Sequence, residues 1–235
     1  MNLFYTPLIQ GDTHLLEESE SKHAIRVLRL TRGDQVVLVD GRGGWYEAVI
    51  EEDHPKRCLL SIQSRKEDSH PLGYSLHLAV APTKNLERFE WFLEKSTEIG
   101  ISEITPILCA RSERRQVKMD RLERILIAAM KQSFKAHKPV INEALSFEEF
   151  IQLDHPGLRG IAACFGSERV GIEQLGTEGP FTVMVGPEGD FTGQEVENAI
   201  QAGFAPLHLG RSRLRTETAA VYIAAAVSIL HQVQR

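Results

Sequence analysis

The sequence predicts an α/β protein in which a parallel sheet follows a small β-barrel, and three observations support this fold class. Before residue 70 the apolar segments are short and separated by turn signals such as Gly41-Arg42-Gly43-Gly44, which is typical of a barrel. After residue 73, near-continuous apolar runs alternate with helical patterns, which is typical of a parallel sheet covered on both faces. The segment 65–73 between them is polar and has no periodicity, so it is expected to be a linker. We therefore predict two domains, 1–70 and 74–235.

The N-terminal domain is predicted to contain three strands, at 35–40, 45–51 and 58–64. One helix is expected at 20–28, with Ser19 as its N-cap. This helix would bring three side chains close together, namely His23, Arg26 and Arg29.

The C-terminal domain is predicted to contain five strands, at 76–81, 104–110, 158–165, 181–185 and 207–210. A helix at 86–99 should end at Gly100, because glycine favours helix C-termini. Thr192 and Glu195 form a capping-box pattern at the start of another helix, which reaches Ala202. The last helix, at 218–233, is apolar almost all round, so we expect it to pack in the core and against a partner subunit.

Two polar, glycine-containing segments each follow an apolar strand and open a helix, and they cover residues 186–191 and 209–219. In a parallel sheet both would lie at the carboxyl edge, where open α/β folds bind ligands through free backbone N–H groups. The sequence contains neither a P-loop nor a G-x-G-x-x-G motif, so the usual phosphate and dinucleotide signatures are missing. Ordinary chain reversal is the alternative interpretation. We expect a small-molecule site at this edge.

The overall charge of −5 hides a strong polarity along the chain. Residues 111–138 contain nine basic and three acidic side chains, a net +6, whereas residues 139–210 carry a net −9. Within the basic segment a helix is expected to begin at Asp120 as N-cap, with apolar positions on one face and basic residues on the other: Arg121, Arg124, Lys131, Lys135 and Lys138. This basic stripe is either a solvated helix face or a surface that meets nucleic-acid phosphates.

Several classes of protein are disfavoured by composition. The N-terminus lacks the pattern of a signal peptide, and the longest apolar run, 219–230, is shorter than a membrane span needs. Cys58, Cys109 and Cys164 form no C-x-x-C pair, so neither a disulfide framework nor a metal site is suggested. We expect a cytoplasmic protein with no metal and no membrane partner.

The pattern G-P-E-G-D-F-T-x-x-E followed by L-G-x-x-x-L-R-T-E-T-A resembles the ribosomal RNA small subunit methyltransferase E family, of the SPOUT superfamily with the α/β trefoil knot. Further stretches resemble the family in order along nearly the whole chain, among them His23 with 26–29, Lys84, Arg88, 94–100, 104–106, 111–112, 132–133 and Pro139. The chain departs from the family's frequent residues at Lys131, Lys135 and Asp190, where glutamate, arginine and glycine are common.

The resemblance implies a PUA-like RNA-binding barrel followed by a SPOUT-type knotted domain that binds S-adenosyl-L-methionine and forms a homodimer. The implied reaction is methylation of N3 of a specific uridine in 16S rRNA, within the small ribosomal subunit. Two rivals stay open. One is a related knotted enzyme that methylates a ribose 2′-hydroxyl or another base, and the other is an RNA-binding assembly factor without catalysis.

The resemblance also implies the site residues. Those expected around the cofactor are Gly166, Gly186, Pro187, Glu188, Gly189, Leu209, Gly210, Leu214, Arg215, Thr216, Thr218 and Ala219. Arg215 is expected to stabilise negative charge on the uracil, and Glu217 is either the general base or a carboxylate that stabilises a helix N-terminus. The residues expected to bind RNA are His23, Arg26, Arg111, Arg114, Arg115, Arg121, Arg124, Lys131 and Lys135.

Overall fold

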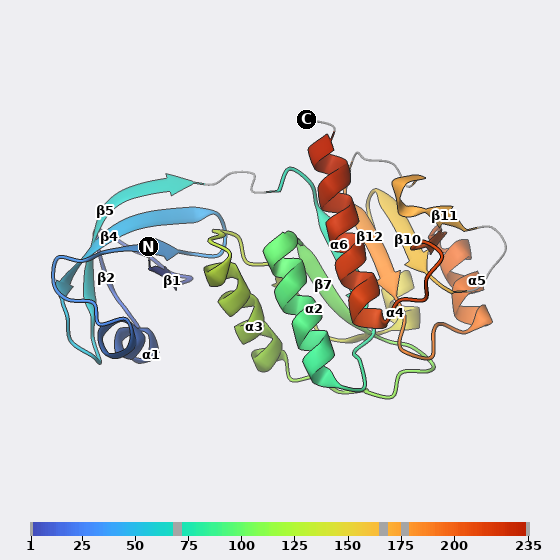
Figure 1. The fold of residues 1–235 in the computed structure, drawn as a ribbon, viewed down its shortest axis with the longest axis horizontal. Coiled ribbons are helices and arrows are strands. Elements are labelled where there is room, and N and C mark those ends of the chain that lie inside the picture. Colours follow the sequence, from blue (N-terminus) through green and yellow to red (C-terminus); the bar gives the residue numbers. More distant parts are fainter. Residues whose placement is uncertain (1, 68–71, 165–168, 175–178, 234–235) are drawn as a thin grey trace. The chain divides into compact units, whose positions relative to one another are not determined.

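A computed structural model describes residues 2–67, 72–164, 169–174 and 179–233 of the chain (Figure 1). Its contacts divide the chain into two compact units. The first unit comprises Met1–Pro71 together with Met130–Lys138, and the second comprises Leu72–Ala129 together with Pro139–Arg235. The end of the basic segment therefore packs with the N-terminal residues, an arrangement that no local pattern in the sequence indicates.

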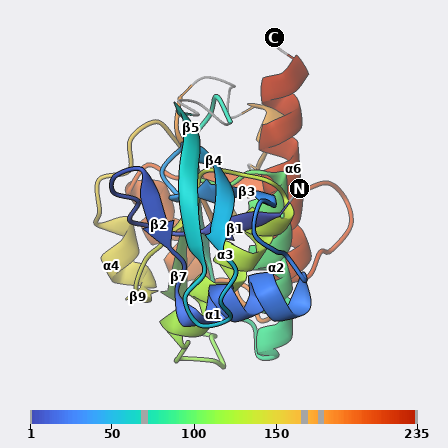
Figure 2. The ribbon, with the colours of Figure 1, turned by 90° about the vertical axis from the view of Figure 1, so that its left-hand side faces the viewer.

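The first unit is built on a five-stranded sheet in the order β1-β3-β4-β5-β2 (Figure 2). The strands are β1 (Leu3–Tyr5), β2 (Thr13–Leu15), β3 (Gln35–Val39), β4 (Gly44–Glu52) and β5 (Leu59–Glu67). β1 pairs with β3 in parallel, the other pairs are antiparallel, and two register shifts between β4 and β5 are of the kind that bends a sheet. β5 continues to Glu67, so part of the segment predicted to be a linker is strand instead, because Trp45 and Tyr46 on β4 give it a partner.

The predicted helix of the first unit begins earlier than expected and changes its winding. α1 covers Glu18–Lys22 and continues into a π-helix, η1, over His23–Val27. Glu17 rather than Ser19 occupies the N-cap position. The start is fixed by Ser21, whose buried hydroxyl donates to the Leu16 carbonyl at 3.0 Å and accepts the Cys58 N–H at 3.0 Å.

The second unit contains the predicted parallel sheet. Its strand order is β11-β13-β10-β12-β6-β7-β8, with β9 paired to β7, and the pairings among these strands are parallel. The strands are β6 (Leu76–Val80), β7 (Glu103–Leu108), β8 (Val140–Ile141), β9 (Leu145–Ser146), β10 (Leu158–Ala162), β11 (Val170–Gly171), β12 (Phe181–Val185) and β13 (Ala205–His208). The five predicted strands are thus confirmed within a few residues, while the knot implied by the resemblance stays a prediction.

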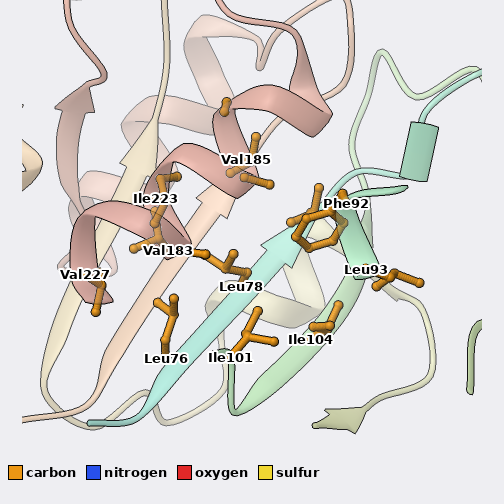
Figure 3. Packing of buried hydrophobic residues seen from close by; sticks show 14 of the residues in the cluster. Leu76, Leu78, Phe92, Leu93, Ile101, Ile104, Val183, Val185, Ile223 and Val227 are labelled. Atoms are coloured by element: carbon orange, nitrogen blue, oxygen red, sulfur yellow. The ribbon is translucent and has the colours of Figure 1, made fainter. Parts of the chain in front are cut away.

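Helices cover both faces of this sheet, because successive strand residues alternate between two apolar clusters. On one face Leu76, Leu78 and Val183 pack with α2 (Leu86–Ile99), α3 (Met119–Gln132) and α6 (Thr216–Val233), as Figure 3 shows for part of the cluster. On the other face Ala79 and Met184 pack with α4 (Phe147–Ile151) and α5 (Gly193–Gln201). A short 3₁₀ turn at Ile172–Gln174 belongs to the first face, because Ile172 is buried in the cluster that contains α6. This burial on two faces explains the near-continuous apolar runs.

The helix signals were accurate where they are local. α2 has the predicted bounds and ends at Gly100, whose φ of 131° favours glycine, and α5 has the predicted capping box of Thr192 and Glu195. The prediction for α3 was wrong at both ends. The helix begins at Met119, so Asp120 lies in its first turn, and it ends at Gln132, so Lys135 and Lys138 lie beyond the helix rather than on its basic face.

Candidate functional site

A cavity of about 330 Å³ lies at the carboxyl edge of the parallel sheet in the second unit. The ends of three neighbouring strands, β13, β10 and β12, supply its walls. Of the residues expected around a cofactor, those that line it are Gly186, Pro187, Glu188, Leu209, Gly210, Leu214, Arg215, Thr216 and Ala219. Gly189 and the exposed Thr218 are not among the lining residues, and Gly166 lies outside the described residues.

The turn after β12 is fixed by contacts from both sides. A Cβ atom on Gly186 would lie 3.0 Å from the ring of Phe191, a tight contact, so the packing there favours glycine. The N–H of Asp190 donates to the Pro187 carbonyl at 2.9 Å, which closes a β-turn. The Glu188 carboxylate accepts the N–H of Lys84 at 2.9 Å, which ties the turn to the loop before α2.

Asp190 connects this turn to a third wall of the cavity. Its φ is 61°, in the left-handed region that aspartate tolerates better than most residues. One carboxylate oxygen accepts the N–H of Cys164 at 2.9 Å and the other accepts the N–H of Phe191 at 2.8 Å. Burial and the Asp190 charge raise the pKa of the Cys164 thiol, so this cysteine is neutral and has little nucleophilic character.

The two glycine-containing segments are joined directly by Thr216. This residue is the first of α6 and is buried, and its hydroxyl donates to the carbonyl of Gly186 at 2.9 Å. α6 therefore begins two residues before the predicted start, because Thr216 is held against the neighbouring turn. The bond places the start of α6 beside the turn after β12 and makes them parts of one cavity.

Arg215 and Glu217 point in different directions. Arg215 is exposed and lines the cavity. Glu217 is buried and is not among the lining residues; one of its carboxylate oxygens lies 3.8 Å from Nε of Arg88 on α2, and the other has no hydrogen-bond partner among the described residues. Both lie at the N-terminal end of α6, where a carboxylate is stabilised by free N–H groups.

Two arginines of the basic segment hold main-chain carbonyls around the cavity. Arg111 donates to the carbonyls of Gly189 at 2.8 Å and Phe191 at 3.3 Å. Arg114 donates to the carbonyls of Thr83, at 3.2 Å, and Lys84, at 2.8 Å. These guanidinium groups stiffen the turns while keeping their positive charge, since a carbonyl does not neutralise it.

The remaining basic residues have varied surroundings. Arg115 is exposed and makes no hydrogen bond or ion pair with another described residue, and Arg124 donates to the Asp120 carbonyl of its own helix at 3.0 Å. Arg121 forms an ion pair with Glu90 at 2.5 Å, which raises the pKa of Arg121. Within the first unit, Lys131 pairs with Glu20 at 2.8 Å, and burial lowers the pKa of Lys135.

His23 and Arg26, also in the first unit, are both exposed on the π-helix η1. The His23 ring stands edge-on to Phe4, with 6.4 Å between the ring centres. π-helical turns are rare and occur often at functional sites. The geometry leaves both side chains accessible to a partner.

Sequence reasoning expected a third wall only at Gly166, which lies outside the described residues, and it missed other residues that line the cavity. Its third wall consists of Ala162, Ala163 and Cys164 at the end of β10, and Asp190, Ser212 and Arg213 also line it. The apolar run that ends near residue 163 was the available signal, but the strand order that brings β10 between β12 and β13 is not encoded locally. Among the described residues, no helix could cross a membrane and no group of histidine, cysteine and carboxylate side chains could hold a metal.

The chain matches two protein-family models. The RNA methyltransferase domain matches residues 70–228, and the RNA methyltransferase PUA domain matches residues 16–63. Among curated relatives, ribosomal RNA small subunit methyltransferase E of Rickettsia conorii is 30% identical over 209 residues, which cover 87% of this chain and 84% of the relative.

Solved structures agree over the whole chain. A probable rRNA-methyltransferase from Porphyromonas gingivalis is 41% identical, with a TM-score of 0.93 and coverage of 100% of both chains. A ribosomal RNA small subunit methyltransferase E from Neisseria gonorrhoeae, bound to S-adenosyl methionine, is 27% identical with a TM-score of 0.89 and coverage of 98% of both chains. The chain belongs to the ribosomal RNA small subunit methyltransferase E family, with an RNA methyltransferase PUA domain and an RNA methyltransferase domain.

Proposed function

We propose that this chain methylates small-subunit ribosomal RNA with S-adenosylmethionine as the methyl donor, and that the target is N3 of a uridine in 16S rRNA. One observation chiefly supports this: the two segments that carry the family resemblance, 186–191 and 209–219, line a single cavity and are joined by the Thr216 hydroxyl. The similar proteins from Rickettsia conorii and Neisseria gonorrhoeae are named ribosomal RNA small subunit methyltransferase E, and the second was crystallised with S-adenosyl methionine.

The cavity fits such a cofactor in size and chemistry. Its volume of about 330 Å³ lies within the usual range for small-molecule sites. Apolar side chains suited to an adenine face line it, namely Leu207, Leu209, Leu214 and Ala219. Gly186 and Gly210 contribute main-chain donors and acceptors, and Arg213 and Arg215 contribute positive charge. When bound, S-adenosylmethionine supplies an electrophilic methyl group. Gly166, Gly189 and Thr218 stay predicted contacts.

Arg215 is the residue we propose to act on the target base. Methylation at N3 requires loss of the uracil N3 proton, which spreads negative charge over the two uracil oxygens. An exposed guanidinium group that lines the cavity is suited to stabilise that charge. The base must also leave its stack to enter the site, and its orientation there can lower the barrier by roughly 7–11 kcal/mol in favourable cases.

Of the two interpretations of Glu217, the geometry favours the structural one. The carboxylate is buried and faces Arg88 rather than lining the cavity, so it supports the start of α6 and the position of its neighbour Arg215. A general-base role for Glu217 is the alternative, and it would require the side chain to reach a base bound in the cavity.

RNA is proposed to contact both units. In the second unit the contacts are proposed for Arg111, Arg114, Arg115, Arg121 and Arg124, and in the first for His23, Arg26, Lys131 and Lys135. A homodimer is proposed through the second domain, 74–235, because Tyr222, Ile229 and Val233 on α6 are 45%, 58% and 80% exposed. We also propose that the protein acts in the cytoplasm.

Nucleoside analysis tests the proposal. 16S rRNA from cells lacking the protein should be missing 3-methyluridine at one position, and purified protein with S-adenosylmethionine should restore it on small subunits from those cells. A missing 2′-O-methylated nucleoside, or another methylated base, would replace the N3 assignment. Calorimetry that detects no S-adenosylmethionine binding would instead favour an RNA-binding assembly factor.

A further inference from the structure

Phe134 in the first unit places a large aromatic side chain on the surface in an unfavourable backbone conformation. Its φ is 54°, in the left-handed region, and its side chain is 50% exposed. Among the described residues other than glycine, only Arg29 and Asp190 share a positive φ. A bulky residue in this region is uncommon and indicates either strain or a function.

The end of α3 explains the conformation but not the side chain. The N–H of Lys135 donates to the Met130 carbonyl at 3.1 Å, and the N–H of Phe134 donates to the Lys131 carbonyl at 3.3 Å. These two bonds define a Schellman motif with Phe134 at the position that glycine usually occupies, because a Cβ atom there costs free energy. The helix would therefore end at least as well with glycine.

Packing does not explain the phenylalanine either. The residues that anchor this turn are Met130 and Ala136, which are buried against Leu3, Val37 and Val39, and Phe134 is not part of that cluster. The backbone after it is tied to the turn between β3 and β4, since Gly43 N–H donates to the Ala136 carbonyl at 3.1 Å. The ring is thus exposed on a turn with fixed neighbours on both sides.

The basic residues near Phe134 in the sequence indicate a nucleic acid as its partner. Lys135 follows Phe134 directly, at the end of the segment that carries a net +6, whereas Lys131, one helical turn before Phe134, is paired with Glu20. Proteins bind unpaired bases by stacking them on exposed aromatic rings next to basic residues that meet the phosphates. A ring on a turn whose backbone is already fixed loses less conformational entropy when a base stacks on it than a ring on a mobile loop would.

We infer that Phe134 is a stacking platform for an unpaired base of the ribosomal RNA substrate. The inference rests on the proposed function, because its ligand is the proposed ribosomal RNA substrate. It deepens that function by adding an RNA contact in the first unit, outside the cofactor cavity. The strained backbone is then maintained for RNA binding rather than for folding.

The test compares Phe134→Gly with Phe134→Trp, and uses Leu8→Ala, another exposed apolar residue of the first unit, as the control. Thermal unfolding and binding to protein-free 16S rRNA are measured for each. Phe134→Gly should raise the melting temperature by about 2–4 °C, since strain is removed, yet weaken RNA binding about tenfold. Phe134→Trp and Leu8→Ala should bind RNA like the unaltered protein.

Three outcomes would overturn the inference. Unchanged RNA affinity in Phe134→Gly would show that the ring makes no RNA contact, and a lower melting temperature together with weaker binding would show that it packs in the fold. Weaker binding to whole small subunits but not to protein-free 16S rRNA would assign the ring to a ribosomal protein. If the unaltered protein binds 16S rRNA but methylates nothing, the proposed function fails, while the comparison of RNA affinities still tests Phe134.

Discussion

Replacement of Thr216 by valine tests whether one hydrogen bond joins the two halves of the cavity. Valine keeps the shape of the side chain but removes the hydroxyl that donates to the Gly186 carbonyl at 2.9 Å. Leaving the buried Gly186 carbonyl without this hydrogen bond should cost about 1–3 kcal/mol of free energy. If the lost bond disturbs the position of the two cavity segments, the Kd for S-adenosylmethionine should rise about tenfold, the equivalent of ~1.4 kcal/mol.

Calorimetric titration with S-adenosylmethionine and thermal unfolding measure the two consequences separately. Thr97→Val is the matched control, because Thr97 is equally buried in the second unit and donates to the Leu93 carbonyl at 2.7 Å, within α2 and away from the cavity. Thr97→Val should lower the melting temperature without changing the Kd. A Kd for Thr216→Val that stays within twofold of the unaltered protein would refute the role of this bond.

Three further predictions concern Asp190, Glu217 and His77. Asp190→Gly removes the acceptor of the Cys164 N–H and should raise the Kd for S-adenosylmethionine about tenfold. Asp190→Asn keeps an acceptor oxygen and should retain the Kd of the unaltered protein. Equal calorimetric Kd values for the two variants would contradict this. Glu217→Gln should keep the methyl-transfer rate within about tenfold, because its carboxylate faces Arg88, and a loss of about a thousandfold with an unchanged melting temperature would instead identify a general base. Burial lowers the pKa of His77 to about 4 from 6.5, so the unfolded chain takes up the proton first and the free energy of unfolding should fall as the pH drops from 6.5 to 4, by up to about 3 kcal/mol. Urea unfolding at both pH values should show a smaller fall for His77→Gln, and an equal fall would be evidence against this assignment.

Elements whose signals are local were predictable from the sequence. α2 has a capping asparagine, an amphipathic run and a terminal glycine within one segment, and β12 is a short apolar run between turn residues. By contrast, β1 and β2 are three residues each, too short for a periodic pattern. α4 was missed although Ser146 and Glu149 form a capping box, because only five residues follow it.

The cavity was predictable in part for the same reason. Its two glycine-containing segments have recognisable compositions, but the wall at Ala162–Cys164 depends on β10 lying between β12 and β13. The sequence shows that Arg111 and Arg114 are basic. It does not show that they hold carbonyls 78 and 30 residues away along the chain, because such contacts follow from the fold.

The basic segment therefore has two different ends, although its composition looks uniform. In the second unit, Arg111 and Arg114 are bound to neutral carbonyls and Arg115 has no polar partner among the described residues, so their positive charge stays available to phosphates. In the first unit, the charge of Lys131 is largely cancelled by Glu20 at 2.8 Å. Electrostatic attraction of RNA is thus concentrated at 111–115, next to the cavity turns, whereas the end of α3 has less free charge to offer, and an aromatic ring such as that of Phe134 supplies there a contact that does not depend on charge.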